Sequence, residues 1–380
     1  MNIRNRFRVF CLVVSSILVL SINAQSFSVT LRGTVIDRPQ SSQLMLIKYG
    51  EDARSTEWIS IPIVDGKFEY VLNCDHEELY QLIFYDEWRR AAWKPVEFIS
   101  EQGVINFTLH PFNLSHENIV EGGALNKAFQ DFIIEGSDRE KRLEEKIETQ
   151  IGKLSEDAPD FSSAMEAVVD SLVQEFALWV LQYVRERPTI AGYSILLFAK
   201  DFLFERLDIS QIVDVYQTVF APKFPNHPHT ARMKILFAGL SVKAGVPFVD
   251  FTAVDFTGKQ VRLSERIAGK PTVLHLWASW CAPCRKTGME LIPVYEEFRD
   301  KGFVVIGVAR ERNISAAVAA IELDKYPWEN LVELNDAEQI WAKYGIGNSG
   351  GSVFLIDEKG NIVAVEPSVE KIRDFLLNNL

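Results

Sequence analysis

The apolar and polar positions along the chain divide it into three parts with different periodicities. From residue 27 onward, short runs that alternate between apolar and polar side chains are separated by glycine and aspartate turns. Such alternation is typical of β-strands that bury one face. The runs are FSVTLRGTVI, QLMLIKY, KFEYVLN, LYQLIFYD and VINFTLH. The pattern predicts an antiparallel β domain over residues 27–112.

Between residues 121 and 240 the apolar residues recur three or four positions apart, which is the spacing of an amphipathic helix. The clearest stretches are LNKAFQDFI, REKRLEEKIETQIGKL and AMEAVVDSLVQEFALWVLQYV. We therefore expect a helical region over residues 121–240.

The last part, residues 245–380, alternates between strand and helix patterns. Two buried strands, TVLHLWA and FVVIGVA, are each followed by a helical stretch, RKTGMELIPVYEEFRDK and ISAAVAAIELDK. FTAVDFTGKQVRL and SVFLIDEKGNIVAV are expected to form hairpins, and SVEKIRDFLLNNL a closing helix. This order predicts an α/β domain whose mixed sheet is covered by helices on both faces.

Residues 1–24 have the layout of a secretory signal peptide. Three arginines precede an apolar-to-small run from Val9 to Leu20, and Ala24 is a small residue suitable for cleavage. The apolar run is short for a membrane-spanning helix. We expect export with cleavage, in preference to an uncleaved anchor, and Cys11 would be removed with the peptide.

Composition narrows the function classes. Acidic residues outnumber basic ones by 52 to 40, and the formal net charge is −12. This excess argues against nucleic acid or an anionic membrane surface as a partner. The four cysteines are too few for a disulfide scaffold in a chain of 380 residues.

Two of those cysteines, Cys281 and Cys284, lie in the stretch WASWCAPCRK, where a predicted buried strand meets a predicted helix. The start of a helix carries unpaired N–H groups and a positive partial charge, which favour the thiolate of Cys281. Cys284 lies one turn further along the same helix face, close enough to form a disulfide. The pair therefore predicts a redox-active dithiol.

Other uses of the pair fit less well. A zinc site needs two more ligands, and no Cys or His follows Cys284. A c-type haem needs His directly after the second cysteine, where Arg285 stands. A purely structural disulfide is unusual between residues three apart at a helix start. No metal or other cofactor is predicted.

Residues 245–380 resemble the thioredoxin-fold domain of the TlpA-like thiol–disulfide oxidoreductases. The matching segments are GVPFVDFTAVDFTGKQVRLSE, GKPTVLHLWASWCAPCRK, GFVVIGVA, and WAKYGI followed by VFLIDEKGNIVA. The preceding β-rich and helical parts are similar, more weakly, to those that precede such domains in some secreted Gram-negative bacterial proteins. The resemblance implies a periplasmic reductase of disulfide-bonded proteins that is recharged by a membrane electron donor.

The resemblance also implies roles for individual residues. Cys281 would attack the substrate disulfide and Cys284 would resolve the mixed disulfide. Trp280, Gly350 and Gly351 would line the place where the substrate binds.

Three positions depart from the family pattern. His275 stands where thioredoxins have a buried Asp and TlpA-like proteins often have Asn. It is a candidate proton acceptor for Cys284, and the alternative is a core histidine held by backbone hydrogen bonds. Thr287 and Met289 replace the Glu and Pro that many relatives carry after the second cysteine.

The third departure is Gly351, which occupies the usual position of a cis-proline. Because a cis bond before any other residue is costly, we expect a trans peptide there. We also expect the loop NSGGS to use its two glycines for backbone angles closed to other residues.

Two other functions remain as alternatives. A peroxidase of the peroxiredoxin kind would need Thr or Ser at the position of Ala278. A binding module with vestigial cysteines could use YDEWRRAAWKP, which contains Trp88, Arg89, Arg90 and Trp93, although aromatics packed on a neighbouring domain explain it more simply.

The remaining cysteine, Cys74, ends a predicted strand in VLNCD. An odd cysteine in a secreted protein can pair between chains. A small buried hydrophobic residue is the favoured interpretation.

Overall fold

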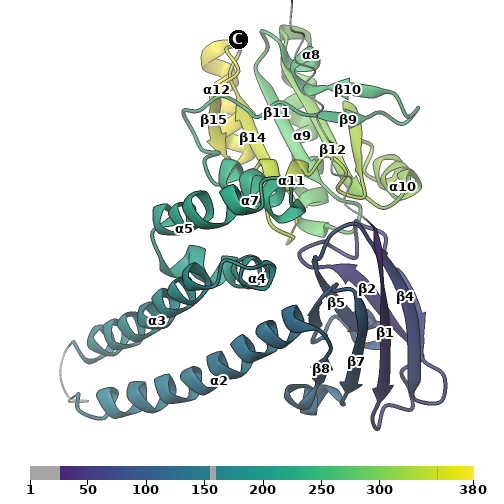
Figure 1. Cartoon of the computed structure of the whole chain (residues 1–380). Coiled ribbons are helices and arrows are strands. Elements are labelled where there is room, and N and C mark those ends of the chain that lie inside the picture. Colours follow the sequence, from purple (N-terminus) through teal and green to yellow (C-terminus); the bar gives the residue numbers. More distant parts are fainter. Residues whose placement is uncertain (1–25, 155–159, 349) are drawn as a thin grey trace, which may run out of the picture.

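The computed structural model describes residues 26–154, 160–348 and 350–380. The predicted signal peptide and Cys11 lie outside the described residues. A β domain, a helical region and an α/β domain follow one another along the chain (Figure 1). The fold class predicted from the sequence is confirmed.

The β domain consists of two four-stranded sheets that enclose one core. The sheet orders are β4-β1-β7-β8 and β3-β2-β5-β6. The strands are β1 (Phe27–Val35), β2 (Gln43–Lys48), β3 (Ile59–Pro62), β4 (Lys67–Cys74), β5 (Leu79–Phe84), β6 (Val96–Ile99), β7 (Gly103–Leu109) and β8 (Ile119–Glu121). A short helix α1 (Tyr85–Arg89) follows β5, and a 3-10 helix spans Phe112–Glu117.

Alternating side chains of the two sheets form this core. Leu31, Leu44 and Phe98 are fully buried in it, and Cys74 lies among the same residues. The Cys74 thiol has no disulfide partner among residues 26–154, 160–348 and 350–380, and burial raises its pKa. This placement fits the small buried hydrophobic residue predicted from the sequence.

One strand pair differs from the expected antiparallel arrangement. β1 pairs with β4 antiparallel on one side and with β7 parallel on the other. The hydrophobic period of a strand decides which face it buries but not the direction of its neighbour, so the sequence pattern does not reveal this pair.

The helical region connects the two other parts. It comprises α2 (Ala124–Ile151), α3 (Phe161–Glu186), α4 (Ile190–Arg206), α5 (Ile209–Val215), a π-helical turn (Tyr216–Phe220), α6 (Ala221–Lys223) and α7 (Pro228–Gly239). α4 begins at Thr189, whose side chain accepts the N–H of Gly192, and it is buried on nearly all sides. α2 packs on β6, where the Asn126 amide bonds both the N–H and the carbonyl of Ile99.

The α/β domain has a seven-stranded sheet in the order β10-β9-β13-β12-β11-β14-β15. Its strands are β9 (Thr252–Val254), β10 (Gln260–Arg262), β11 (Thr272–Trp277), β12 (Val304–Glu311), β13 (Glu329–Leu334), β14 (Ser352–Ile356) and β15 (Ile362–Val365). Its helices are α8 (Leu263–Ile267), α9 (Ala282–Phe298), α10 (Ile314–Asp324), α11 (Ile340–Lys343) and α12 (Val369–Asn379), with a 3-10 turn at Arg299–Lys301. β11, β12 and β13 are parallel to one another, whereas β14 pairs antiparallel with β11 and β15 pairs antiparallel with β14.

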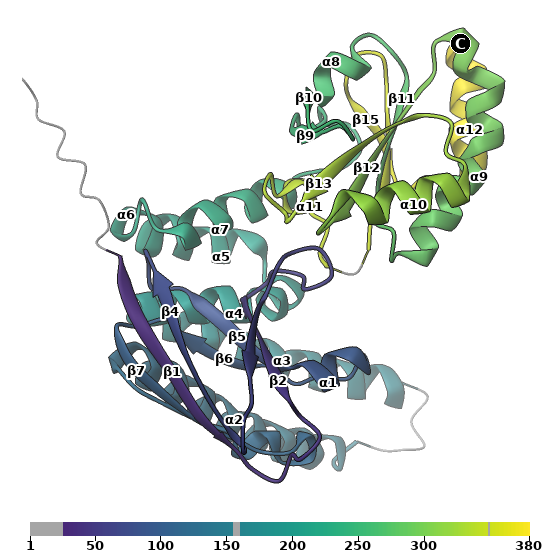
Figure 2. The same ribbon diagram turned by 90° about the vertical axis from the view of Figure 1, so that its right-hand side faces the viewer.

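Helices cover both faces of this sheet, as the sequence predicts. Val273 and Trp277 of β11 pack with α9, α10 and α12, which lie on one side of the sheet in Figure 2. Leu274 and Leu276, which point the opposite way, pack with α8 and α11. β11 is therefore buried on both faces, and its carboxyl end leads directly to the cysteine pair.

The β domain and the helical region both contact the α/β domain. α7 lies against α11, and residues 48–56 after β2 reach the edge of the α/β domain where the cysteines lie (Figure 1). Within the described residues, the helices are all too short or too polar to cross a membrane.

Candidate active site

Cys281 and Cys284 form a disulfide, with an S–S distance of 2.00 Å. Cys281 is the N-cap of α9, and its Sγ accepts the N–H of Cys284 at 3.3 Å. Pro283 lies in the first turn, where a missing N–H costs least. The structure is thus the oxidised form of the pair, with the Cys281 sulfur at the positive end of the helix.

The two sulfurs differ in their exposure. Cys281 is only 6% exposed, whereas Cys284 is partly exposed. A hollow of about 260 Å³ adjoins Cys284, and its wall includes His275, Thr287 and Glu366. Thr287 occupies the outer face of α9, where its hydroxyl bonds the Pro283 carbonyl at 3.2 Å.

The loop before β14 lies directly against the disulfide. The N–H of Gly351 donates to Cys284 Sγ at 3.1 Å, and a Cβ on Gly350 would lie 3.3 Å from Cys281 Sγ. Trp341 of α11 fixes this loop, because its indole N–H donates to the Gly350 carbonyl at 2.6 Å. Gly350 and Gly351 therefore lie beside the two sulfurs, and their role in substrate binding stays a prediction.

The described residues contain no cis peptide bond, so the peptide before Gly351 is trans, as predicted. The expected unusual backbone angles are wrong, because neither Gly350 nor Gly351 has a positive φ. Gly351 is required for a different reason. A Cβ at this position would overlap the carbonyl oxygen of Leu276 on β11.

His275 lies in β11, below α9, and is 1% exposed. Its Nε2–H donates to the carbonyl of Cys284 at 3.1 Å, and Nδ1 has no hydrogen-bond partner in the described part of the chain. Burial lowers the pKa of His275 to about 4, although the bond to Cys284 acts in the opposite direction. The ring is therefore neutral at neutral pH and is held by the backbone, and its role as proton acceptor stays a prediction.

Trp280, directly before Cys281, contacts the β domain. The guanidinium carbon of Arg54 lies 3.8 Å from the centroid of the Trp280 ring. The buried indole N–H of Trp280 has no hydrogen-bond partner among the described residues.

Several residues around the site do not stand out in the sequence. Arg54 also donates to the carbonyl of Asn348, and the Asn348 amide donates to the carbonyl of Gly50 at 3.3 Å. Arg310 at the end of β12 is 4% exposed and bonds both Asp336 and the Asn348 side chain. No local motif marks these residues, because their partners lie far away in the sequence.

Two buried carboxyl groups support turns of the α/β domain, one just before the cysteines and one at the start of α11. Glu311 accepts the N–H of Ser279 at 2.5 Å, and burial raises the pKa of Glu311. Glu333 accepts the N–H groups of Glu338 and Ile340, and burial raises its pKa to about 7.

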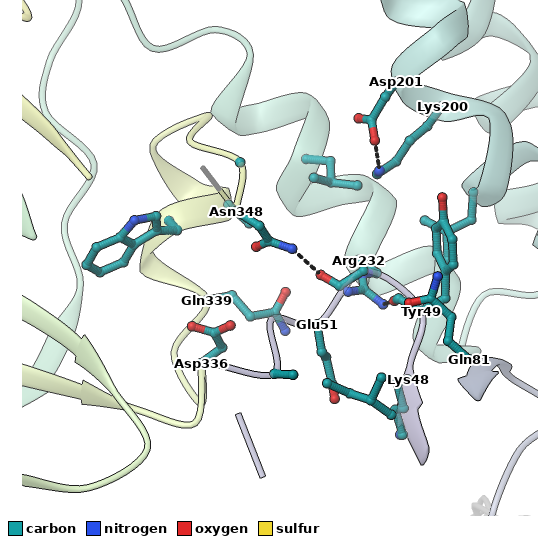
Figure 3. A pocket seen from close by; sticks show the side chains of 18 of the residues that line it. Lys48, Tyr49, Glu51, Gln81, Lys200, Asp201, Arg232, Asp336, Gln339 and Asn348 are labelled. Atoms are coloured by element: carbon teal, nitrogen blue, oxygen red, sulfur yellow. Dashed lines mark hydrogen bonds and ion pairs between the residues drawn. The ribbon is translucent and has the colours of Figure 1, made fainter. Parts of the chain in front are cut away.

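A larger cavity of about 660 Å³ lies between the three parts of the chain (Figure 3). Arg232 of α7 projects into it and bonds the Tyr49 carbonyl, and Asn348 reaches it from the α/β domain. Trp88 and Trp93 also line it, while Arg89 and Arg90 are exposed. Trp88 packs on Tyr85 and on Ile83 of the β domain. Packing within the β domain therefore explains the position of Trp88, one of the two tryptophans of this cluster.

The AhpC/TSA family model matches residues 244–365. Over 133 residues, the chain is 28% identical to the thiol–disulfide oxidoreductase ResA of Bacillus subtilis, covering 34% of this chain and 71% of that protein. It is 28% identical over 114 residues to ResA of Bacillus anthracis, covering 30% of this chain and 64% of that protein. The chain thus spans a little under two thirds of the length of that relative.

Solved structures also match this part of the chain. The thioredoxin domain of a thiol–disulfide oxidoreductase from Bacteroides vulgatus is 28% identical and covers 37% of this chain and 99% of that one, with a TM-score of 0.34. A thiol:disulfide interchange protein from Bacteroides sp. is 28% identical and covers 36% of this chain and 90% of that one, with a TM-score of 0.34.

The family model carries the assignment, since the residues that it matches, 244–365, contain the cysteine pair. The last third of the chain is therefore a thioredoxin-like domain that is similar to the AhpC/TSA family and to the ResA thiol–disulfide oxidoreductases, and Cys281–Cys284 forms its CxxC disulfide.

Proposed function

We propose that this protein is an exported thiol–disulfide oxidoreductase that reduces disulfides in protein substrates. The observation that carries the proposal is the Cys281–Cys284 disulfide at the start of α9, in a domain related to ResA proteins. A thiol at this position is favoured as thiolate, which is the nucleophile of disulfide exchange.

The reaction starts from the reduced pair. The Cys281 thiolate attacks one sulfur of the substrate disulfide, a Cys281–substrate bond forms, and the other substrate sulfur leaves as a thiolate that takes up a proton. Cys284 then loses its proton and attacks Cys281 Sγ, which releases the second substrate thiol. The substrate disulfide becomes two thiols, and the protein dithiol becomes the disulfide seen in the structure.

A new cycle requires two electrons and two protons from a dithiol donor. We propose a membrane electron carrier for this step and the periplasm for the reaction, with the CxxC facing that compartment. The basic, then apolar segment at residues 1–24 supports export, and the resemblance to TlpA-like proteins supports the direction of electron flow.

Reduction of insulin disulfides by dithiothreitol tests the activity. The wild-type protein should accelerate it, while Cys281→Ser should be inactive and Cys284→Ser should accumulate a mixed disulfide that mass spectrometry identifies. A binding module with vestigial cysteines would show no acceleration. Faster consumption of hydrogen peroxide than of insulin disulfides would instead support the peroxidase alternative.

Cell fractionation tests the compartment. We expect the mature protein in the periplasmic fraction, with its N-terminus near residue 25. Recovery of the uncleaved chain in the cytoplasm would contradict the proposed location.

A further inference from the structure

Access to Cys281 is bordered by two segments of the α/β domain. Trp280 precedes the cysteine in the chain, and a Cβ on Gly350 would lie 3.3 Å from Cys281 Sγ. A substrate sulfur that approaches Cys281 from the side of the β domain passes these segments. A side chain that bridges them on that side therefore limits which disulfides reach the sulfur by this route.

Arg54 of the β domain makes this bridge. Its guanidinium stacks on the Trp280 ring at 3.8 Å, and its Nη2 donates to the carbonyl of Asn348. A stacked Arg on Trp is among the stronger cation–aromatic contacts. The single side chain thus touches both segments beside the disulfide.

Asp52 of the β domain also holds the Arg54 guanidinium in place. Asp52 accepts Nε and Nη2 of Arg54 at 3.0 and 2.8 Å, and it accepts the Arg54 backbone N–H at 2.9 Å. Asp52 is itself 6% exposed and lies 3.9 Å from Arg310 Nη1. The position of Arg54 is therefore fixed before any substrate arrives.

The outer side of Arg54 remains open to solvent, because its side chain is 40% exposed while Cys281 is 6% exposed. A narrow substrate can pass beside a partly exposed side chain, whereas a bulky substrate is sterically excluded by it. From these contacts we propose that Arg54 is a specificity-determining residue, which favours disulfides on small molecules and extended chain segments over disulfides on folded protein surfaces.

This inference rests on the proposed function for its consequence, but its geometry can be tested without turnover. In a Cys284→Ser background, the rate of modification of Cys281 is measured with N-ethylmaleimide and with a maleimide that carries a polyethylene glycol chain. The peptide that contains Cys281 is quantified by mass spectrometry. The two reagents share their chemistry and differ in size.

Arg54→Ala should raise the ratio of the large-reagent rate to the small-reagent rate by about tenfold, the factor expected when one stacked cation and one hydrogen bond are lost. Arg54→Lys, which keeps the charge but not the flat stacking group, should give an intermediate ratio. Arg32→Ala serves as the matched control, because Arg32 pairs with Glu69 at 2.8 Å on the exposed surface of the same domain. That control should leave the ratio unchanged.

An unchanged ratio in Arg54→Ala would overturn the proposal. So would an equal rise with both reagents, because a general loosening of the domains would expose Cys281 to small reagents as well. With the full dithiol, Arg54→Ala should increase the reduction rate of insulin relative to that of hydroxyethyl disulfide, and a decrease would contradict exclusion by Arg54. If the wild-type protein reduces neither disulfide, the proposed function fails while the maleimide ratio still decides the role of Arg54.

Discussion

At the residue scale, the site depends on what touches each sulfur. Cys281 lies at the N-terminus of α9, and Cys284 contacts the Gly351 N–H and has His275 beneath its carbonyl. These surroundings support the proposed attacking role of Cys281, because the helix terminus favours its charged form.

Cys281 should therefore have the lower thiol pKa in the reduced protein, below the value of about 8.5 for a free cysteine. The pH dependence of iodoacetamide alkylation, followed separately for each cysteine by mass spectrometry, gives both values. The comparison uses the midpoints because the lower exposure of Cys281 slows its absolute rate at every pH. A lower midpoint for Cys284 would reverse the assignment.

His275 should make the stability of the domain depend on pH. The pKa of His275 is about 4 in the folded protein, and it is near 6.5 in the unfolded chain. As pH falls between these values the unfolded chain binds the proton first, so the folded state loses stability. His275→Asn lacks this group. From pH 7 to pH 4, the unfolding free energy of the wild type should therefore fall by up to about 3 kcal/mol more than that of the variant.

Urea unfolding at several pH values measures this difference, and a constant difference would show that the ring is not buried as a neutral group.

The same variant tests the proton-acceptor role of His275. Slower release of the mixed disulfide in His275→Asn, with the domain still folded, would support that role. An unchanged release rate across neutral pH would leave His275 with its structural role alone.

At the scale of elements, the backbones of β11 and β14 approach each other closely beside the cysteine helix. β14 pairs antiparallel with β11, with Leu276 opposite Ser352, and the chain enters this pairing at Gly351. The absence of a side chain at Gly351 lets the loop approach the β11 backbone, and this contact brings the Gly351 N–H to Cys284 Sγ.

Gly351→Ala should therefore destabilise the domain by about 1–3 kcal/mol, the usual cost of overpacking a filled site. Gly347→Ala is the control, since a Cβ at Gly347 would meet no atom within 4 Å, and an unstrained surface change should stay within about 0.5 kcal/mol. Chemical denaturation of the oxidised proteins measures both. Equal stability of the two variants would show that the strands can separate at no cost.

At the scale of the whole molecule, charged side chains join the β domain to the α/β domain. Arg310 is the most buried of them, with Asp336 as a bidentate partner, Asn348 as a further acceptor and Asp52 of the β domain 3.9 Å from its Nη1. Because Arg310 connects segments of the β domain and of the α/β domain, its replacement should destabilise both domains.

Arg310→Met should lower the stability by about 3 kcal/mol, because it leaves the largely buried Asp336 carboxylate without its cation. Asp52 keeps its pairing with Arg54 in this variant. Arg266→Met removes a comparable pair with Glu329, but that pair is partly exposed and its loss should cost at most about 1 kcal/mol. Thermal unfolding followed by circular dichroism compares the two variants. Hydrogen exchange should also become faster in residues 50–56 for Arg310→Met only. Similar melting temperatures would contradict the connecting role.

The strongest periodic segments could be predicted without the structure. β1, β5, β11, α10 and α12 lie within the runs expected from their apolar spacing, because this spacing depends on near neighbours in the chain. β12 and α9 overlap their predicted runs but extend beyond them, to Glu311 and back to Ala282. The strands β3, β6 and β13 are not among the predicted runs. β3 and β6 have only four residues each, and the burial of all three strands comes from the sheet around them.

By itself, the sequence determined two features of the redox site: a buried strand that ends where a helix begins, and two cysteines one helical turn apart. These features are local, so the order of residues is enough to specify them. Tertiary structure alone decided that β7 runs parallel to β1, that Gly351 is needed for close approach rather than for its backbone angles, and that Arg54 reaches Trp280. Each of these features depends on contacts between segments that are distant in the chain and come together only when the core forms. Local periodicity carries no information about such long-range contacts.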